Sequence, residues 1–374
     1  MKKLLLLLLV ATTSHGATLW KPAGYWYKEV TTQGSARFSK ITDLQLKNLC
    51  TITPPIMPPT SLMPFVDTTK NVTPAVGFNT LRLQPTTELP LFPAEEGAFR
   101  IPCPVSHMSN DDPIVFPNMP GKSHHHTFFG NTSTNANSNL ADLNSQGNST
   151  CLGGIMNKSA YWIPSMIDTT TGAPIAPISA LIYYKAGDIG FISTETITVP
   201  PKGLRMITGN SKAVPILPDP SPWLGTYTCN TPNGTTPWSK AIPNCNVGDV
   251  LTYKISFPQC WDGVNLDSPD HKSHMANQLL INTVTGEYHC PADHPVKIPT
   301  ITINVNYANP VTDGMKAWRL SSDNYDHAIA GGYSAHADWV NGWDETLLGG
   351  IIKNCIAAKK DAHANLLCDG RTMY

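Results

Sequence analysis

Hydrophobic and polar positions alternate, or apolar positions cluster, in short runs over most of the chain after residue 97. Three runs are the clearest, residues 180–185, 251–257 and 299–305, and each is rich in β-branched and aromatic side chains. Gly, Pro and Asn bound these runs, which is typical of β-strands buried on one or both faces. We therefore expect a mainly β protein from residue 98 onward.

One segment near the C-terminus follows a helical period instead. It begins after Asp344, a residue type preferred at helix N-termini. Many short strands joined by Pro- and Gly-rich loops favour a β-sandwich or jelly-roll-like core with long irregular loops and this one C-terminal helix. Residues 98–374 are numerous enough for a single large domain. The apolar positions at helical spacing are Leu347, Leu348, Ile351, Ile352 and Cys355.

The composition before residue 98 is different. Residues 17–97 are rich in Pro and Thr, most clearly in the run from Thr53 to Thr60, and only residues 41–49 have a helical pattern. Such a composition favours extended chain over a packed core. We therefore expect residues 17–97 to be a partly ordered N-terminal region laid over the main domain.

The first residues predict export. Two lysines precede the apolar residues 4–10, and small residues follow, as in a secretory signal peptide that ends at Gly16. A cut after Ser14 would instead expose His15 as an N-terminal amine and imidazole, the copper-binding arrangement of lytic polysaccharide monooxygenases; Gly16 is the favoured position. No later apolar run approaches 18 residues, so we expect a secreted, soluble chain with no membrane span.

Cysteine usage agrees with an extracellular protein. Nine cysteines in an exported chain indicate disulfides with one thiol left over. The pairs Cys229/Cys245 and Cys355/Cys368 are close enough to close small loops, although the sequence does not determine the connectivity. No Cys-x-x-Cys pair occurs, which argues against a zinc–thiolate site. The formal net charge of −1, with no basic run, argues against nucleic acid as a partner, and we expect a monomer.

Three short segments hold six of the twelve histidines: residues 123–127, 270–274 and 336–344. In a chain with 14% charged residues, this crowding of imidazoles, carboxylates and tryptophans indicates a functional site. Each segment alone also has a purely structural interpretation, as a buried polar network, a turn cap or a loop anchor. The occurrence of all three together favours one shared site.

In the first segment, the strand period of two would place His124 and His126 on one face and His125 on the other. Two imidazoles on one face can hold a metal ion, or one can act as a base while the other binds a substrate oxygen. The Glu that the cupin metal motif would place after the second His is absent, because Thr127 and two phenylalanines follow.

The second and third segments pair histidine with aspartate. On a helical turn Asp270 and His274 would face the same way, whereas an extended chain would pair His271 with Ser273. A carboxylate that accepts from an imidazole N–H fixes its tautomer and raises its basicity. The third segment repeats this pairing near the predicted helix N-terminus, where anions are favoured. The candidate catalytic residues are His124, His126, Asp270, His271, His274, His336 and Asp338.

Tryptophans lie in or beside these segments. Indole faces next to polar groups are typical of sugar-binding sites, because the ring covers the C–H face of a sugar while the polar groups bind its hydroxyls. The alternative is that these rings fill the hydrophobic core. The candidate substrate-binding residues are Trp162, Arg205, Trp261, Asp262, Trp343 and Asp344.

Eight short blocks occur in a fixed order along the chain: Phe99–Cys103, Asp112–Val115, Ser123–Thr127, Tyr161–Pro164, Leu204–Met206, Phe257–Gly263, Asp270–Met275 and Gly342–Asp344. With these blocks the chain resembles the large secreted family known as domain of unknown function 1996. The resemblance covers about Ala98 to Glu345; the N-terminal region and the Pro-rich segment near Ile216 to Thr236 depart from it. In fungi this family is often attached to cell-wall-stress-component (WSC) modules. The resemblance implies an extracellular location and association with glycan-rich walls, but no reaction.

Three functions remain in competition. The first is an extracellular enzyme that cleaves a cell-wall or matrix polysaccharide by hydrolysis or elimination, without a cofactor. Its acid/base pair would be Asp270 with His271 or His274, opposite His126 and Asp338. The second is a non-catalytic glycan-binding wall protein. The third is a metal-dependent enzyme that holds a divalent ion with His124, His126 and a third ligand. No Gly-x-Ser-x-Gly elbow or phosphate-binding loop occurs.

Overall fold

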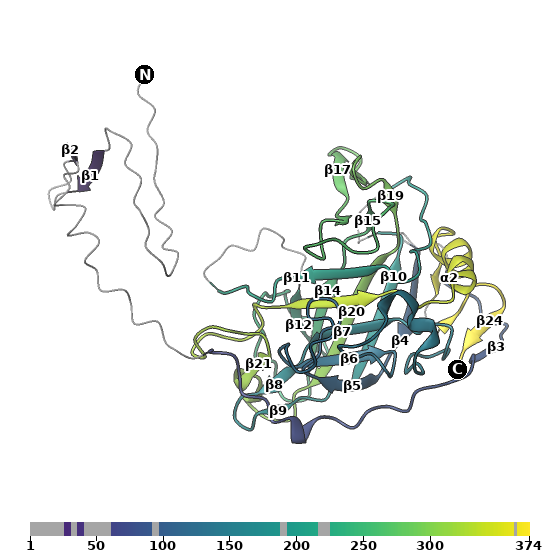
Figure 1. Ribbon diagram of the computed structural model, residues 1–374, viewed down its shortest axis with the longest axis horizontal. Helices are drawn as coiled ribbons and strands as arrows, with labels where there is room; N and C mark the ends of the chain where they lie inside the picture. Colours follow the sequence, from purple (N-terminus) through teal and green to yellow (C-terminus); the bar gives the residue numbers. More distant parts are fainter. Residues whose placement is uncertain are drawn as a thin grey trace. The chain divides into compact units, whose positions relative to one another are not determined.

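The computed structural model describes residues 26–30, 36–40, 61–91, 97–187, 193–215, 225–362 and 365–374 (Figure 1). The chain forms two units, residues 1–60 and residues 61–374. In the first, β1 (Trp26–Val30) pairs with β2 (Ala36–Lys40). The predicted signal peptide, with its alternative at His15, and the helical pattern of residues 41–49 lie outside the described residues.

The second unit contains a seven-stranded sheet whose centre is made by the three strands that the sequence predicts. These central strands, β14, β20 and β10, pair antiparallel, with Ile182 opposite Ile303 and Tyr253 opposite Val305. Burial alternates along β10, as expected for a strand with one face in the core. In order, the sheet consists of β13 (Gly234–Thr235), β12 (Thr226–Thr231), β14 (Val250–Ser256), β20 (Thr300–Ala308), β10 (Ser179–Lys185), β4 (Ala98–Pro102) and β23 (Asp361–Ala362).

A second, five-stranded antiparallel sheet packs against the first. Side chains from both sheets, among them Ile303 and Tyr253 from the first and Ile163 and Trp339 from the second, form one continuous hydrophobic core. The predicted mainly β, sandwich-like fold is thereby confirmed (Figure 1). In order, this sheet consists of β11 (Arg205–Gly209), β22 (His336–Val340), β7 (Ala160–Pro164), β6 (His126–Gly130) and β5 (Val105–Ser109).

Small sheets and short helical turns make up the loops between the large sheets. The Pro/Thr-rich region contributes β3, which pairs with β24 near the C-terminus. The small sheets are β3 (Leu83–Pro85) with β24 (Arg371–Met373); β21 (Trp318–Leu320), β8 (Met166–Asp168) and β9 (Ala173–Pro174); β16 (Met275–Ala276), β15 (Cys260–Trp261) and β19 (Val296–Lys297); and β17 (Leu279–Asn282) with β18 (Glu287–His289). The 3-10 turns are η1 (Thr68–Lys70), η2 (Leu140–Ser145) and η3 (Gly314–Ala317).

The predicted C-terminal helix is confirmed as α2 (Glu345–Ile351), which continues into a π-helical turn, η4 (Ile352–Ile356). The Asp344 carboxylate accepts a hydrogen bond from the Leu347 N–H at 2.9 Å and so caps the first turn. Leu348 and Ile351 are buried against the core, as their spacing predicts.

Disulfides join distant and neighbouring segments of the second unit. Two of them, Cys229–Cys245 and Cys355–Cys368, are the small-loop pairs that the spacing suggested. The others, Cys103–Cys151 and Cys260–Cys290, close longer loops. The ninth cysteine, Cys50, lies outside the described residues. Among the residues that the structure describes, no helix has both the length and the apolar character needed to cross a membrane.

The outer face of the five-stranded sheet is covered rather than exposed. Phe128, Trp162 and Val340 project from it into a second, smaller hydrophobic cluster. Ile114 and Leu143, from the segment that follows β5 and β6, close this cluster from outside. The face therefore provides a buried environment in which polar groups are shielded from water.

Candidate metal centre

The covered outer face carries polar residues as well as apolar ones. Side chains alternate along a strand, so His336 and Asp338 on β22 lie on the same face as Val340, and His126 on β6 lies on the same face as Phe128. Asp338 is opposite Trp162 on β7, the strand between β22 and β6. The sheet register thus brings histidines more than 200 residues apart in sequence to one place.

Three imidazoles meet there. His124 lies two residues before the start of β6, and its Nε2 lies 3.0 Å from Nε2 of His336. Its ring centroid is 4.3 Å from that of His126 and 4.9 Å from that of His336. One nitrogen from each ring lies within 4.8 Å of the others. His126 and His336 are buried, while His124 keeps partial exposure.

Two of these rings have a defined tautomer. Nδ1 of His126 lies 2.9 Å from the Asp111 carbonyl oxygen, and Nδ1 of His336 lies 2.8 Å from the Ser334 carbonyl oxygen. A carbonyl oxygen only accepts, so each Nδ1 carries the proton and each Nε2 presents a lone pair to the cluster. His126 Nε2 is buried without a hydrogen-bond partner. Proteins orient metal-binding imidazoles in this way.

Two buried carboxylates lie beside the imidazoles. Both oxygens of Asp338 are buried without a hydrogen-bond partner. Asp112 comes from the covering segment, and its Oδ1 accepts from the backbone N–H groups of Ile114 and Val115 at 3.0 and 2.9 Å. One oxygen of each carboxylate and one nitrogen of His126 lie within 4.8 Å of one another. A carboxylate left unpaired in this environment calls for a compensating charge or proton.

Burial controls the protonation of the cluster. Loss of hydration raises the pKa of Asp338 well above its usual range, and the nearby Asp112 charge raises it further. Burial also lowers the pKa of His336 to about 4, and holds the pKa values of His124 and His126 far below the usual one. Near neutral pH the imidazoles are therefore uncharged and able to donate lone pairs, while burial favours the protonated form of Asp338, whose proton a cation would displace.

The donor set specifies the kind of ion that fits. Imidazole nitrogens with one or two carboxylate oxygens suit zinc, copper, iron or manganese, whereas calcium and magnesium prefer sites made of oxygens alone. His124, His126, His336 and Asp338 could hold such an ion, with Asp112 adjacent. The third ligand that the metal hypothesis required is therefore His336. His125 lies apart: its Nδ1 is 2.9 Å from Ser165 Oγ, and it belongs to neither group of converging ligand atoms.

The second histidine segment has other partners than expected. Asp270 accepts from the backbone N–H groups of Lys272 and Ser273 and from neighbouring hydroxyls, and these bonds hold its pKa far below the usual value. The expected pair with His271 or His274 is therefore wrong, because Asp270 caps a turn. His271 instead contacts Asp267, with Nδ1 2.9 Å from Oδ1.

His274 is also held by its surroundings. Its Nδ1 lies 2.8 Å from Ser268 Oγ and its Nε2 lies 2.7 Å from the Arg205 carbonyl oxygen. The residues between the two histidines approach the centre: Lys272 Nζ donates to the carbonyl oxygen of Gly209, which is opposite His336 in the sheet. The second segment is thus adjacent to the centre but supplies no ligand atom to it.

The candidate sugar-binding tryptophans are mostly core residues. Trp162 and Trp343 are completely buried, so neither ring offers a face to a sugar in this structure. Trp162 stacks on Phe128, and Trp343 Nε1 donates to the Tyr184 hydroxyl at 2.7 Å. These two assignments require correction, because the residues fill the two hydrophobic clusters on either side of the five-stranded sheet.

The remaining substrate-binding candidates have local structural partners. Asp344 caps α2, and Asp262 accepts from the backbone N–H groups that follow it, capping its own loop. Trp261 Nε1 donates to the Asn265 carbonyl oxygen, and its ring is partly exposed. Arg205 donates to Asp267 Oδ2 at 2.9 Å, which links it to His271. Of this set, Asp344 is exposed, and Arg205, Trp261 and Asp262 are partly exposed.

Two further acidic residues lie in or beside the centre. Asp112 forms part of the centre, and Asp267 holds His271. Asp112 lies within one of the eight sequence blocks, and this was the only sequence signal that it belongs to a functional site. An aspartate followed by proline is also typical of a turn, so the pattern alone does not indicate a metal ligand.

Comparison of the sequence with known proteins identifies the family to which the chain belongs. No curated protein and no solved structure matches the chain. The family model described as domain of unknown function (DUF1996) matches residues 112–343, a range that begins at Asp112 and includes every residue of the candidate metal centre. Because this match covers more than half of the 374 residues, the chain belongs to the DUF1996 family.

Proposed function

We propose that this protein is an extracellular metal-dependent enzyme whose divalent ion is held by His124, His126, His336 and Asp338. The observation that carries the proposal is the convergence of three imidazole nitrogens beside an unpartnered, buried carboxylate. A purely structural polar network would satisfy these groups with hydrogen bonds, because each unpaired buried group destabilises the fold. Here the backbone binds the outer nitrogens of His126 and His336, while Nε2 of His126 has no partner and Nε2 of His336 contacts only another imidazole, that of His124.

The chain's own residues define what such a centre can do. A bound divalent ion would act as a Lewis acid and lower the pKa of water. The carbonyl oxygens of Asp111 and Ser334 hold two imidazoles in orientation, and the Asp338 carboxylate offsets positive charge. His124, the partly exposed member, marks the side from which a substrate would approach. His271, oriented by Asp267, is a further imidazole close enough to Asp112 to act on its carboxyl group electrostatically.

The proposed substrate class is a cell-wall or matrix polysaccharide, cleaved by hydrolysis or elimination. Four disulfides support an extracellular location, since such bonds persist outside the cytosol. The family resemblance implies an association with glycan-rich cell walls, and this association favours an extracellular polysaccharide as the substrate. This substrate assignment is independent of the metal assignment, and the two are tested separately.

The metal assignment is tested on protein without a polyhistidine tag. We expect about one equivalent of zinc, copper, iron or manganese by elemental mass spectrometry, or after incubation with each ion. His336→Ala should lose it, whereas His327→Ala, which changes an exposed histidine far from the ligand set, should keep it. A protein that takes up none of these ions, or a His336→Ala variant that binds as tightly as the wild type, would exclude the metal centre.

The substrate assignment is tested by activity. Metal-loaded and chelator-treated protein should be compared on a panel of neutral and uronic polysaccharides. New reducing ends would indicate hydrolysis, and products that absorb in the ultraviolet would indicate elimination. Metal binding without cleavage of any glycan would refute the substrate assignment but would still support the metal centre.

A further inference from the structure

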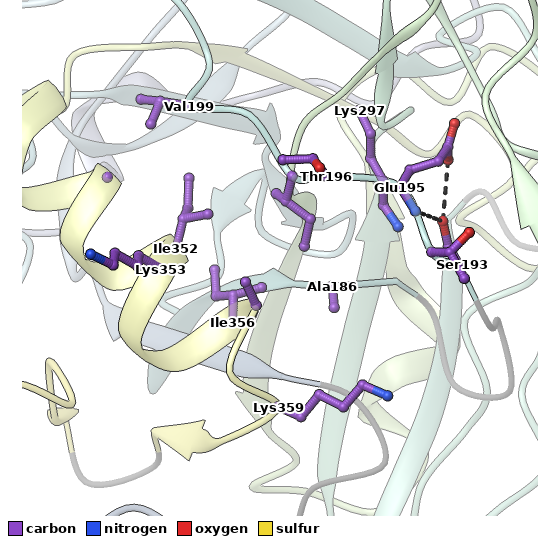
Figure 2. A pocket seen from close by; sticks show the side chains of 14 residues that line it. Ala186, Ser193, Glu195, Thr196, Val199, Lys297, Ile352, Lys353, Ile356 and Lys359 are labelled. Carbon is purple, nitrogen blue, oxygen red and sulfur yellow. Dashed lines mark hydrogen bonds between the residues drawn. The ribbon is translucent and has the colours of Figure 1, made fainter.

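A cavity lies at the C-terminal helical segment, away from the metal centre. Its volume is about 470 Å³, within the range of small-ligand sites. Figure 2 shows Ile352 and Ile356 of the helical turn on one side and Ser193, Glu195 and Thr196 on the other. None of the four proposed metal ligands lines it. This cavity is therefore a second concave site, with its own chemistry.

The lining combines an aliphatic floor with hydroxyl groups. Ile352, Ile356 and Val199 provide the apolar surface. Ser193, Thr194 and Thr196 add hydroxyls along one edge. Such a lining is complementary to a sugar ring, because the C–H face of the ring packs on apolar surface while its hydroxyls form hydrogen bonds with polar groups.

The charge of the lining is strongly one-sided. Three lysines, Lys297, Lys353 and Lys359, and one carboxylate, Glu195, line the cavity, so the formal sum is 3 − 1 = +2. The whole chain carries −1, which makes this a local concentration of positive charge. Lys297 is 3% exposed and has a partner of its own, so the exposed positive charge of the cavity comes from Lys353 and Lys359.

The one carboxylate is already engaged. Glu195 Oε1 accepts from the Cys290 N–H at 2.9 Å, and Oε2 accepts from Gln278 Nε2 at 2.8 Å and from Ser193 Oγ at 3.2 Å. These bonds fix its position and spread its charge over three donors. Lys353 and Lys359 form no ion pair within the described part of the chain. Their charges are therefore available to an anion.

We infer that this cavity binds an acidic sugar residue of a polysaccharide, with the sugar carboxylate toward the lysines and the ring on the aliphatic floor. The inference deepens the proposed function, because it assigns a uronic-acid polymer as the glycan, and it rests on that proposal only for the choice of a polysaccharide. The site recognises the substrate away from the metal centre, as a binding subsite would. Charge complementarity favours uronic over neutral sugars.

The test uses the full-length protein and oligomers of galacturonic acid of three to five units, with neutral glucan oligomers of equal length for comparison. Binding is measured by calorimetry at low and at high salt. Lys353→Glu/Lys359→Glu changes the lining from +2 to 1 − 3 = −2. The matched control is Lys70→Glu/Lys316→Glu, which makes the same change at two exposed lysines elsewhere. All four positions are on the surface, so folding should be preserved.

We expect the acidic oligomer to bind and the neutral oligomer to bind at least about tenfold more weakly. The Lys353/Lys359 variant should lose at least about tenfold in affinity and the control less than about threefold, with weaker binding at high salt. Equal losses in both variants, equal binding of neutral oligomers, or no binding of the acidic oligomer would each overturn the inference. His336→Ala should keep this binding while losing metal, so failure of the metal centre and failure of this site are distinguishable.

Discussion

Replacing Asp338 with asparagine should make the metal-free protein more stable and the metal-loaded protein less stable. Asparagine has nearly the same shape but carries no charge and does not titrate. In the metal-free protein, Asp338 is a buried carboxyl group whose two oxygens have no partner. In the metal-loaded protein, the same group would be a ligand. One substitution thus has opposite effects in the two states.

The magnitude follows from the raised pKa of Asp338. In the unfolded chain an aspartate releases its proton near pH 3.9, whereas burial in the folded protein holds the proton to much higher pH. The folded state holds this proton over that interval, so the contribution of Asp338 to the free energy of unfolding is greatest below pH 3.9 and falls as the pH rises. The slope is about 1.4 kcal/mol per pH unit until the raised pKa is passed. Asp338→Asn should remove this slope.

The assay is urea denaturation at pH 5, 6 and 7, with a chelator and then with the bound metal in excess. With the chelator, the wild-type protein should lose stability relative to the variant as the pH rises from 5, by about 1.4 kcal/mol for each pH unit that lies below the raised pKa of Asp338. With free metal at about 100 times the dissociation constant, the wild type should gain about 2.7 kcal/mol. The variant should gain much less, because it lacks the charged ligand.

Asp323 supplies the control. It is also completely buried, but its carboxylate accepts from the backbone N–H groups of Leu320, Gly332 and Ser334. Asp323→Asn should therefore destabilise the protein in both conditions, since it replaces an acceptor that is in use. If Asp338→Asn destabilises the chelated protein as Asp323→Asn does and leaves the pH slope unchanged, Asp338 is an ordinary structural carboxylate and our reasoning about the centre is wrong.

Three other predictions concern separate parts of the structure. Cys229→Ser/Cys245→Ser should lower the free energy of unfolding by about 3 kcal/mol, seen as a melting temperature several degrees lower, because the bond closes a loop with a sequence separation of 16. Ile303→Ala, at the centre of the sandwich core, should cost about 2–5 kcal/mol in urea denaturation. His125→Ala should keep metal binding by calorimetry while His126→Ala abolishes it; equal loss in both would show that the first segment is oriented differently.

Local sequence patterns were sufficient for the central strands and the C-terminal helix. The strands β10, β14 and β20 lie in the middle of a sheet, where burial requires the β-branched and aromatic residues that make them recognisable. Asp344 and the apolar spacing after it predicted α2 because a cap and a helical period are both local properties. The small sheets between them have two to four residues per strand and leave no such pattern.

The centre could be predicted in part for the same reason. Strand alternation placed His124 and His126 on one face, and this needs only neighbouring residues. That His336 would join them depends on β7 pairing with both β6 and β22, a long-range register that the sequence does not display. Asp270 was misassigned because an aspartate followed by a polar turn looks the same whether it caps the turn or orients a histidine. Trp162 was misassigned because a core indole and a sugar-binding indole differ only in what covers them.

The position of the cluster explains how the fold tolerates it. The main hydrophobic core lies between the two sheets and does not include the polar residues, which are confined to the outer face of the five-stranded sheet. His126, His336 and Asp338 belong to that sheet, whereas Asp112 and His124 belong to the segment between β5 and β6 that covers it. A bound ion would therefore join the cover to the sheet at the place where unpaired polar groups otherwise weaken their contact. The same groups that destabilise the metal-free protein would then hold the cover in place, and this reversal distinguishes a metal centre from a buried structural network.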